Sequence, residues 1–322
     1  MLMVVSLYAL IASAFTFSKA ILSFVQPIFF TGVRMLASGL ILLAYQYFFN
    51  RTQWRFSLKD WFWYLQIMIF MIYFVYVGEF VAMSHGVTSS KSSLFFNLSP
   101  FFTALLGYAL SLETMNKKKW LGLLIGLFGI VPILLAQPTT IENTFSWWRI
   151  SFGELLLLGA VFSSAYAWLV MKRFVHTDTY SPVMINGIAM TGGGIMALVN
   201  SFFVEKAPHF TFTMPGNDAI GQVLLRWFSD YSASIILLIL YSALLILITN
   251  FIFYNAYGFL LRRYSATFLS LVGITTPLFT AVWSWLLLGE KVGWSFALSM
   301  VITSVGLFIF YQEELRRGQE SN

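Results

Sequence analysis

The feature that most constrains this chain is a series of ten apolar stretches, each about 20 residues long, separated mostly by short charged or turn-rich breaks. A helix needs roughly 20 mostly apolar residues to cross the hydrocarbon core of a bilayer. The stretches therefore predict ten membrane-spanning helices and leave no room for a large domain outside the membrane. They cover about residues 2–22, 27–49, 61–84, 90–112, 118–136, 151–171, 180–204, 231–258, 264–288 and 292–311.

Composition excludes an ordinary soluble enzyme. Apolar residues make up 59% of the chain and charged residues 10%, where soluble domains average about 45–50% and about 25%. The sequence has no cysteine, no HExxH and no GxSxG, and its three histidines are far apart with none inside a span. We therefore expect no enzyme, no cofactor and no metal site. The first 18 residues carry no charge, and we interpret them as part of a retained first helix.

The distribution of Lys and Arg predicts the orientation of the chain. Ten spans put both termini on one side of the membrane. With cytoplasmic termini, the inner loops hold twelve Lys and Arg and the outer loops hold four, which is the bias of the positive-inside rule. This dispersed charge explains the net charge of +6 without nucleic acid. We expect a multi-pass protein of the bacterial inner membrane with both termini in the cytoplasm.

An internal repeat divides the chain into halves. Sliding the sequence by 177 residues places residues 87–113 over 264–290, and eight of the 27 pairs are identical. Apolar helices resemble each other by chance, so the matched Pro100 and Pro277, and the glutamate that ends each stretch, carry the argument. Span four then corresponds to span nine. Because a shift of five spans is odd, the second copy crosses the bilayer in the opposite sense.

The predicted fold is an all-α polytopic membrane protein with ten transmembrane helices, arranged as two inverted five-helix repeats around a central cavity. We place the first repeat at residues 1–140, the second at 150–312 and a cytoplasmic tail at 313–322. Two similar halves of opposite topology can exchange conformations and open a central site to one side and then to the other. The architecture therefore predicts alternating access.

Residues 87–131, their partner 264–310 and the opening pattern of Lys19, Pro27 and Arg34 resemble the drug/metabolite transporter superfamily, specifically its ten-helix members with two EamA-type repeats. The most specific part is a Ser/Thr-Pro-x-Phe-Thr-Ala segment with a glutamate 13 residues after the proline, found twice. The resemblance implies secondary transport of small metabolites, whose kinds in this family include amino acids, drugs, sugar nucleotides and S-adenosylmethionine.

Five ionisable side chains fall in the outer half of the predicted spans, where a charge at a helix centre costs about 2.5–3.5 kcal/mol. They are Lys19, Arg34, Glu79, Lys91 and Glu154. Their net charge of +1 suits a solute with both a carboxylate and a cation. Other roles stay open: Lys19 and Lys91 could snorkel to headgroups, Arg34 could pair with Glu79, and Glu154 could favour the helix dipole.

We expect the substrate to meet these charges together with aromatic, serine and amide side chains of neighbouring spans. Glu79 is the strongest single candidate, as a ligand for a substrate ammonium or as a proton carrier. Pro100 and Pro277 are predicted hinges. The predicted substrate-binding residues are Lys19, Arg34, Tyr76, Glu79, Lys91, Ser93, Asn97, Tyr166, Trp168, Tyr254 and Asn255.

The sequence favours a secondary transporter over an intramembrane enzyme or a channel. We expect uptake or exchange of a small zwitterionic or cationic metabolite, amino-acid-like or S-adenosylmethionine-like. S-adenosylmethionine suits the mixed charges because it combines a carboxylate, an ammonium, a sulfonium and a purine. Export of amino acids or of aromatic cationic drugs is the alternative. Expected partners are the metabolite, the lipid bilayer and a coupled proton or counter-substrate, in a monomer or weak homodimer.

Overall fold

The structure is a computed structural model that describes residues 2–51, 54, 57–110, 115–135, 144–145, 150–175, 181–205, 220, 222, 230–253, 256 and 273–320. The helices of its first half are α1 (Leu2–Ile21), α2 (Pro27–Phe49), η2 (Leu58–Asp60), α3 (Trp61–Ile67), η3 (Met68–Tyr73), α4 (Phe74–Ser84), α5 (Ser89–Phe96), α6 (Ser99–Ala109), α7 (Lys117–Phe128) and α8 (Val131–Leu135). A short antiparallel pair, β1 (Thr144–Phe145) and β2 (Ile150–Ser151), precedes α9 (Phe152–Val175), α10 (Pro182–Val204), α12 (Asp230–Leu245), η4 (Ile246–Phe253), α15 (Thr276–Leu288) and α16 (Trp294–Glu320).

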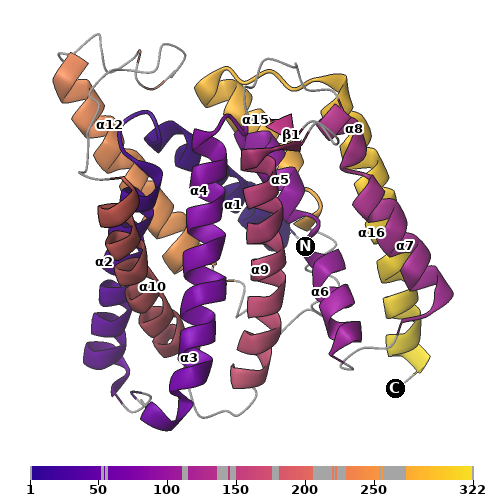
Figure 1. Ribbon diagram of the computed structural model, residues 1–322, viewed down its shortest axis with the longest axis horizontal. Coiled ribbons are helices and arrows are strands. Elements are labelled where there is room, and N and C mark those ends of the chain that lie inside the picture. The colour runs from indigo at the N-terminus through magenta and orange to yellow at the C-terminus, as the bar shows by residue number, and fades with distance from the viewer. Residues whose placement is uncertain are drawn as a thin grey trace.

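The prediction of an all-α polytopic membrane protein is confirmed. Each of the ten predicted spans contains described helix. Seven helices are long and apolar enough to cross a membrane, and Val5–Ile21 and Thr276–Leu288 are shorter apolar helices. Figure 1 shows the helices gathered into one bundle, with α7 and α16 at one edge and α2, α10 and α12 at the other.

Spans that correspond in the predicted repeat pack against each other. The helices α2 and α10 each have 23 residues and a proline in the first turn, and they lie in close contact. A Cβ atom at Gly194 would lie 2.5 Å from the backbone nitrogen of Leu36, so only glycine allows this approach. The other pair is α7 and α16, where a Cβ at Gly122 would lie 2.7 Å from the Phe310 nitrogen.

Corresponding spans are also irregular at corresponding places. Span three contains the π-helical segment η3, and span eight contains the π-helical segment η4. Span four is broken at Asn97 and Leu98, between α5 and α6, and span nine is broken at Ile274 and Thr275, just before α15. The shift of 177 residues places these breaks on each other. Prolines in the first turns of α6 and α15 follow both breaks, since proline is tolerated where the preceding ladder has ended.

The two breaks touch. The side-chain nitrogen Nδ2 of Asn97 donates a hydrogen bond to the Ile274 carbonyl at 3.3 Å. When a two-fold axis relates two repeats, equivalent residues of the two copies can contact each other only close to that axis. We infer that a pseudo-two-fold axis passes through this contact and relates the two halves; the boundaries of the halves stay a prediction.

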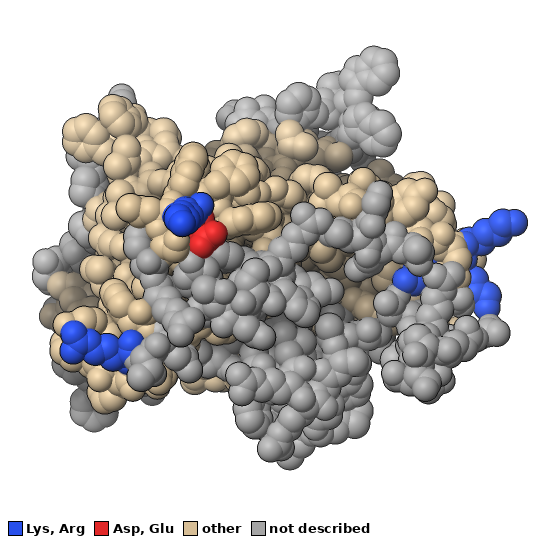
Figure 2. Space-filling model, turned by 90° about the horizontal axis from the view of Figure 1, so that it is seen from below, with Lys and Arg blue, Asp and Glu red and all other residues tan. Residues whose placement is uncertain are grey.

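The end of the bundle where α2 ends and α3 begins is positively charged. Its exposed side chains include Arg51, Lys59, Lys117 and Lys118. Figure 2 looks at the molecule from this end and shows Lys and Arg at the margins of the described surface, with acidic side chains in one place. The candidate site lies in the opposite half, near the last turns of α1 and α4 and the first turns of α2, α5 and α9.

Candidate functional site

Arg34 lies on α2 with its guanidinium enclosed by three helices. It is 3% exposed, and its Nη2 donates a hydrogen bond to Oδ1 of Asn250 in η4 at 3.2 Å. Its Cζ lies 5.2 Å from the ring centroid of Tyr76 and 5.9 Å from that of Phe80. A cation over two aromatic faces is stabilised by their quadrupoles. Arg34 is therefore buried between helices of the two repeats, held by one hydrogen bond and two aromatic rings.

Glu79 lies on the same face of α4 as these rings. It is buried, and its carboxylate is attracted by the positive charge of Arg34. The four residues Tyr76, Glu79, Phe80 and Met83 follow the three- and four-residue spacing of one helix face. Of the alternatives left open for Arg34, the structure shows an electrostatic attraction to Glu79 and a hydrogen bond to Asn250; a role in substrate binding stays a prediction.

Lys19 lies in the last turn of α1 and reaches the next turn of this face of α4. Its Nζ donates a hydrogen bond to the Met83 carbonyl near the end of α4, where helix carbonyls lack intrahelical partners. Lys19 also attracts Glu290, which follows α15. Burial raises the pKa of the Glu290 carboxyl above its ordinary value, while the Ser89 N–H and Lys19 act in the opposite direction.

Lys91 and Glu154 form an ion pair between α5 and α9. Both are buried, so Lys91 does not snorkel to headgroups. Oε2 of Glu154 accepts a hydrogen bond from the Ser151 N–H at 2.7 Å, and the Glu154 N–H donates to Oγ of Ser151 at 3.3 Å. This reciprocal pair is a capping box. Glu154 therefore both caps α9 and neutralises Lys91.

These charged residues form three pairs of opposite sign, Arg34 with Glu79, Lys19 with Glu290 and Lys91 with Glu154, which we together name the outer charge cluster. Its members are Lys19, Arg34, Glu79, Lys91, Glu154 and Glu290. The predicted set lacked Glu290 and carried a net charge of +1, whereas the complete cluster has three positive and three negative groups. Each positive group has a negative partner, which lowers the cost of holding these charges in the bilayer.

Ser93 lies on α5, and Asn97 follows its last residue at the break in span four. Oγ of Ser93 donates to the Ser90 carbonyl at 2.8 Å, and Asn97 makes the contact between the helix breaks. Pro100 and Pro277 lie directly after those breaks. Their role as hinges stays a prediction.

The predicted aromatic residues separate into different environments. Tyr76 faces Arg34, whereas Trp168 is half-buried beside the apolar cluster that includes Met71 and Val170. The Tyr166 hydroxyl donates to Oε1 of Gln66 at 2.6 Å, away from the outer charge cluster. Tyr254 and Asn255 lie outside the described residues.

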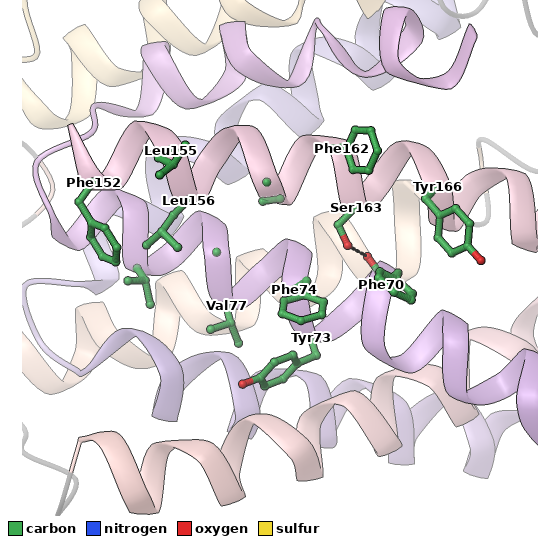
Figure 3. A pocket seen from close by; sticks show the side chains of 14 residues that line it. Phe70, Tyr73, Phe74, Val77, Phe152, Leu155, Leu156, Phe162, Ser163 and Tyr166 are labelled. Carbon is green, nitrogen blue, oxygen red and sulfur yellow. Dashed lines mark hydrogen bonds between the residues drawn. The ribbon is translucent and has the colours of Figure 1, made fainter. Parts of the chain in front are cut away.

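Tyr166 lines an apolar groove of about 720 Å³ between α9 and the η3–α4 segment. Figure 3 shows Phe70, Tyr73, Phe74 and Tyr166 along it, with the hydrogen bond from Ser163 to the Phe70 carbonyl. None of its lining residues is charged. This groove suits apolar groups and is separate from the outer charge cluster.

Sequence reasoning missed two acidic roles. Glu290 was noted only as a mark of the repeat, although its Oε1 accepts from the Ser89 N–H at 3.4 Å. Glu205 ends α10 and accepts from the backbone nitrogens of Ile28 and Phe29, both at 2.8 Å, so it caps α2. The signal for this cap was the start of α2, where the N-cap residue Gln26 makes no capping hydrogen bond, so the first N–H groups of the helix need an acceptor from elsewhere.

Comparison with known proteins decides the family. The sequence profile of the EamA-like transporter family matches residues 1–135 and again residues 151–312. The chain belongs to the EamA-like transporter family. It is a membrane transporter and not an enzyme, as the sequence predicted, and the two matched regions agree with two EamA repeats.

Several curated relatives extend over most of the chain. A protein of Chlamydia muridarum described as an S-adenosylmethionine/S-adenosylhomocysteine transporter is 29% identical, over 95% of this chain and 90% of its own. The protein of the same description from Chlamydia trachomatis serovar D is 29% identical over 95% and 87%. The uncharacterized transporter YoaV of Bacillus subtilis is 24% identical over 88% and 87%.

A solved crystal structure shares the fold. It covers 95% of this chain and 93% of its own, with a TM-score of 0.53 and 14% sequence identity. At this identity the likeness concerns the fold alone.

Proposed function

We propose that this protein is a carrier that exchanges S-adenosylmethionine for S-adenosylhomocysteine by alternating access. The observation that carries the proposal is the likeness to the two Chlamydia transporters across 95% of the chain. The outer charge cluster supports it, because buried groups of both signs match a solute that carries both signs.

The chemistry of the solute assigns roles to the cluster. S-adenosylmethionine combines a carboxylate with an ammonium and a sulfonium, so its net charge is positive. In this proposal Glu79 attracts the cationic part, while Lys19 and Arg34 supply positive charge to the carboxylate; Lys91 is already paired with Glu154. Tyr76 offers an aromatic face next to Glu79.

Exchange has an electrical consequence. S-adenosylhomocysteine lacks the sulfonium and is neutral overall, so a one-for-one exchange moves one positive charge per cycle. A membrane potential then contributes about 2.3 kcal/mol per 100 mV for each charge. An inside-negative potential would drive inward movement of S-adenosylmethionine without a coupled proton.

We also propose the inner membrane of a bacterium as the location, with cytoplasmic termini and a monomer or weak homodimer as the working unit. The positive end of the bundle formed around α3 supports this orientation, since positively charged loops favour the cytoplasm.

The test is uptake of labelled S-adenosylmethionine into proteoliposomes of purified protein. We expect uptake when the vesicles contain S-adenosylhomocysteine, and little uptake into empty vesicles. An inside-negative potential should stimulate it. Competition by amino acids or aromatic cations, with none by S-adenosyl compounds, would instead support the alternative substrates.

Proton coupling through Glu79 is tested in the same vesicles. An imposed pH gradient at zero potential should change the rate if Glu79 carries a proton. A rate that follows only the potential and the internal S-adenosylhomocysteine would leave Glu79 as a substrate ligand.

A further inference from the structure

The N-terminus of α5 lies in the protein interior and holds a carboxylate. The Ser89 N–H donates to Oε1 of Glu290 at 3.4 Å, while Oγ of Thr88 accepts from the Lys91 N–H at 3.2 Å. The first N–H groups of a helix and the positive end of its dipole favour an anion. This contact is long, and although the Ser90 N–H and the Ser284 hydroxyl also act on the carboxylate, Oε2 of Glu290 is buried without a hydrogen-bond partner of normal geometry. Glu290 therefore fits the position only in part.

Three serine hydroxyls around this position are unsatisfied. Ser89, Ser90 and Ser92 are 0%, 3% and 0% exposed, and their Oγ atoms have no hydrogen-bond partner. Buried hydroxyls are almost always paired, because leaving one unpaired is costly. The N–H groups of Ser89 and Ser90 both act on the Glu290 carboxylate. Side chains of a helix tilt toward its N-terminus, and these hydroxyls belong to the same turn of α5 as the N–H groups that hold the carboxylate. Together these groups supply more donors than Glu290 uses.

The charges around this position also point to an exchangeable anion. Lys91 is neutralised by Glu154, and Lys19 faces Glu290. With Glu290 in place the outer charge cluster is neutral overall. With Glu290 withdrawn it carries one net positive charge, opposite a helix N-terminus and three free hydroxyls.

We propose that the N-terminus of α5 binds the carboxylate of the transported zwitterion, and that Glu290 occupies this position when the substrate is absent. The inference rests on the proposed function and specifies its carboxylate subsite. The hydroxyls of Ser90 and Ser92 become hydrogen-bond donors to the bound carboxylate, and Lys19 becomes its counter-ion.

The fold allows Glu290 to leave. It lies in the short connection between α15 and α16, directly after Gly289, which has a left-handed φ of 65°. Its backbone N–H donates to the Ser284 carbonyl of α15 at 3.2 Å, so the second repeat holds its backbone, whereas its carboxylate reaches α5 of the first repeat through the 3.4 Å contact with Ser89. Rocking of one repeat against the other would separate Glu290 from α5 and expose the subsite.

The experiment measures binding of two probes to purified full-length protein: S-adenosylmethionine and its decarboxylated analogue. Ser90→Ala combined with Ser92→Ala should weaken binding of S-adenosylmethionine by about tenfold and leave the decarboxylated analogue unaffected. Ser242→Ala is the matched control, because the Ser242 hydroxyl is already bonded to the Leu238 carbonyl of its own helix. It should change neither affinity.

Glu290→Gln removes the competing charge and should tighten binding of S-adenosylmethionine severalfold without the same gain for the analogue. Equal losses for both probes in the serine variants would show a structural effect and overturn the subsite. So would wild-type protein that binds both probes equally.

Failure of the proposed function gives a different result. If wild-type protein binds neither probe, the substrate assignment is wrong, and the subsite is tested with free amino acids and their methyl esters. Binding of an amino acid that is lost on esterification and weakened in the serine variants supports the subsite. Absence of any carboxylate-dependent binding overturns it.

Discussion

At the scale of single residues, burial in this transporter is made tolerable by pairing charges across helices. Lys91 and Glu154 are 63 positions apart in the sequence and meet in the interior. Glu154 is fixed by its own capping box, so it presents a pre-positioned carboxylate to Lys91. Such pairs are weak evidence for stability but are costly to break from one side.

Breaking this ion pair should destabilise the protein asymmetrically. Lys91→Ala alone should lower the free energy of unfolding by about 3–5 kcal/mol, because Glu154 is left as a buried charge. The double variant Lys91→Met/Glu154→Leu should lose much less than the sum of the single variants. Unfolding in detergent, followed by circular dichroism, measures the stability of the wild type, the two single variants and the double variant. A double variant that loses the sum of the two single losses would contradict the pairing.

Glu79 is expected to act in transport and not in folding. Glu79→Gln should abolish exchange in vesicles while leaving the unfolding temperature within a few degrees of wild type. Glu205→Gln is the control, since Glu205 caps α2 and lies outside the outer charge cluster. It should lower stability by about 1 kcal/mol with exchange retained. Unaltered exchange in Glu79→Gln would remove Glu79 from the site.

The sequence placed Arg34 and Glu79 inside apolar spans, where a charge needs a partner or a cavity, and left open whether Lys91 reaches the headgroups. It could not predict which partners they have. Glu290 follows a span end, where a carboxylate is ordinary on sequence grounds, and only the tertiary fold brings it to Ser89. Tyr166 shows the converse, since its helix turns the ring into the apolar groove.

At the scale of helices, spans four and nine are interrupted where they meet, whereas spans two and seven are continuous. The breaks at Asn97 and Ile274 touch each other, whereas α2 and α10 run unbroken for 23 residues each. Interrupted helices free backbone groups and allow the two segments to change angle. The interrupted spans are therefore the elements expected to move.

Restoring a continuous helix at a break should slow transport without weakening substrate binding. Pro277→Ala removes a residue that cannot donate to the helix ladder and should extend α15 toward its N-terminus. We expect the exchange rate to fall roughly tenfold with little change in substrate affinity, as for a conformational step that limits turnover. A rate equal to wild type, or a loss confined to affinity, would contradict a hinge at this position.

The sequence predicted helix in each span but not the internal geometry of the spans, and α16 continues to Glu320, beyond the predicted end at residue 311. The start of span nine lies outside the described residues. The prolines at 100 and 277 signalled the two breaks. The π-helical segments η3 and η4 carried no such signal, because their residues are almost uniformly apolar and any helix type buries them equally well.

At the scale of the whole molecule, the packing follows the predicted inverted repeat. Spans two and seven pair, spans five and ten pair, and the helix breaks of spans four and nine touch. The repeat was visible in the sequence because prolines and glutamates recur at one offset. Which spans pair could not be read from the sequence, since every apolar helix can pack on any other.

Orientation is a prediction of this symmetry and of the charge bias. Reporter domains fused to the N-terminus and to the C-terminus should both be located in the cytoplasm. A fusion after residue 205 should be located on the outer side. Opposite locations for the two termini would contradict an even number of spans.

The central claim is that the outer charge cluster lies at a single site that opens to each side in turn. The chain has no cysteine, so Ser92→Cys places one thiol on buried α5 without background. A membrane-impermeant thiol reagent added from either side of the membrane should modify this cysteine, and S-adenosylmethionine should protect it from both sides. Modification from one side only, unchanged by substrate while exchange continues, would contradict the account.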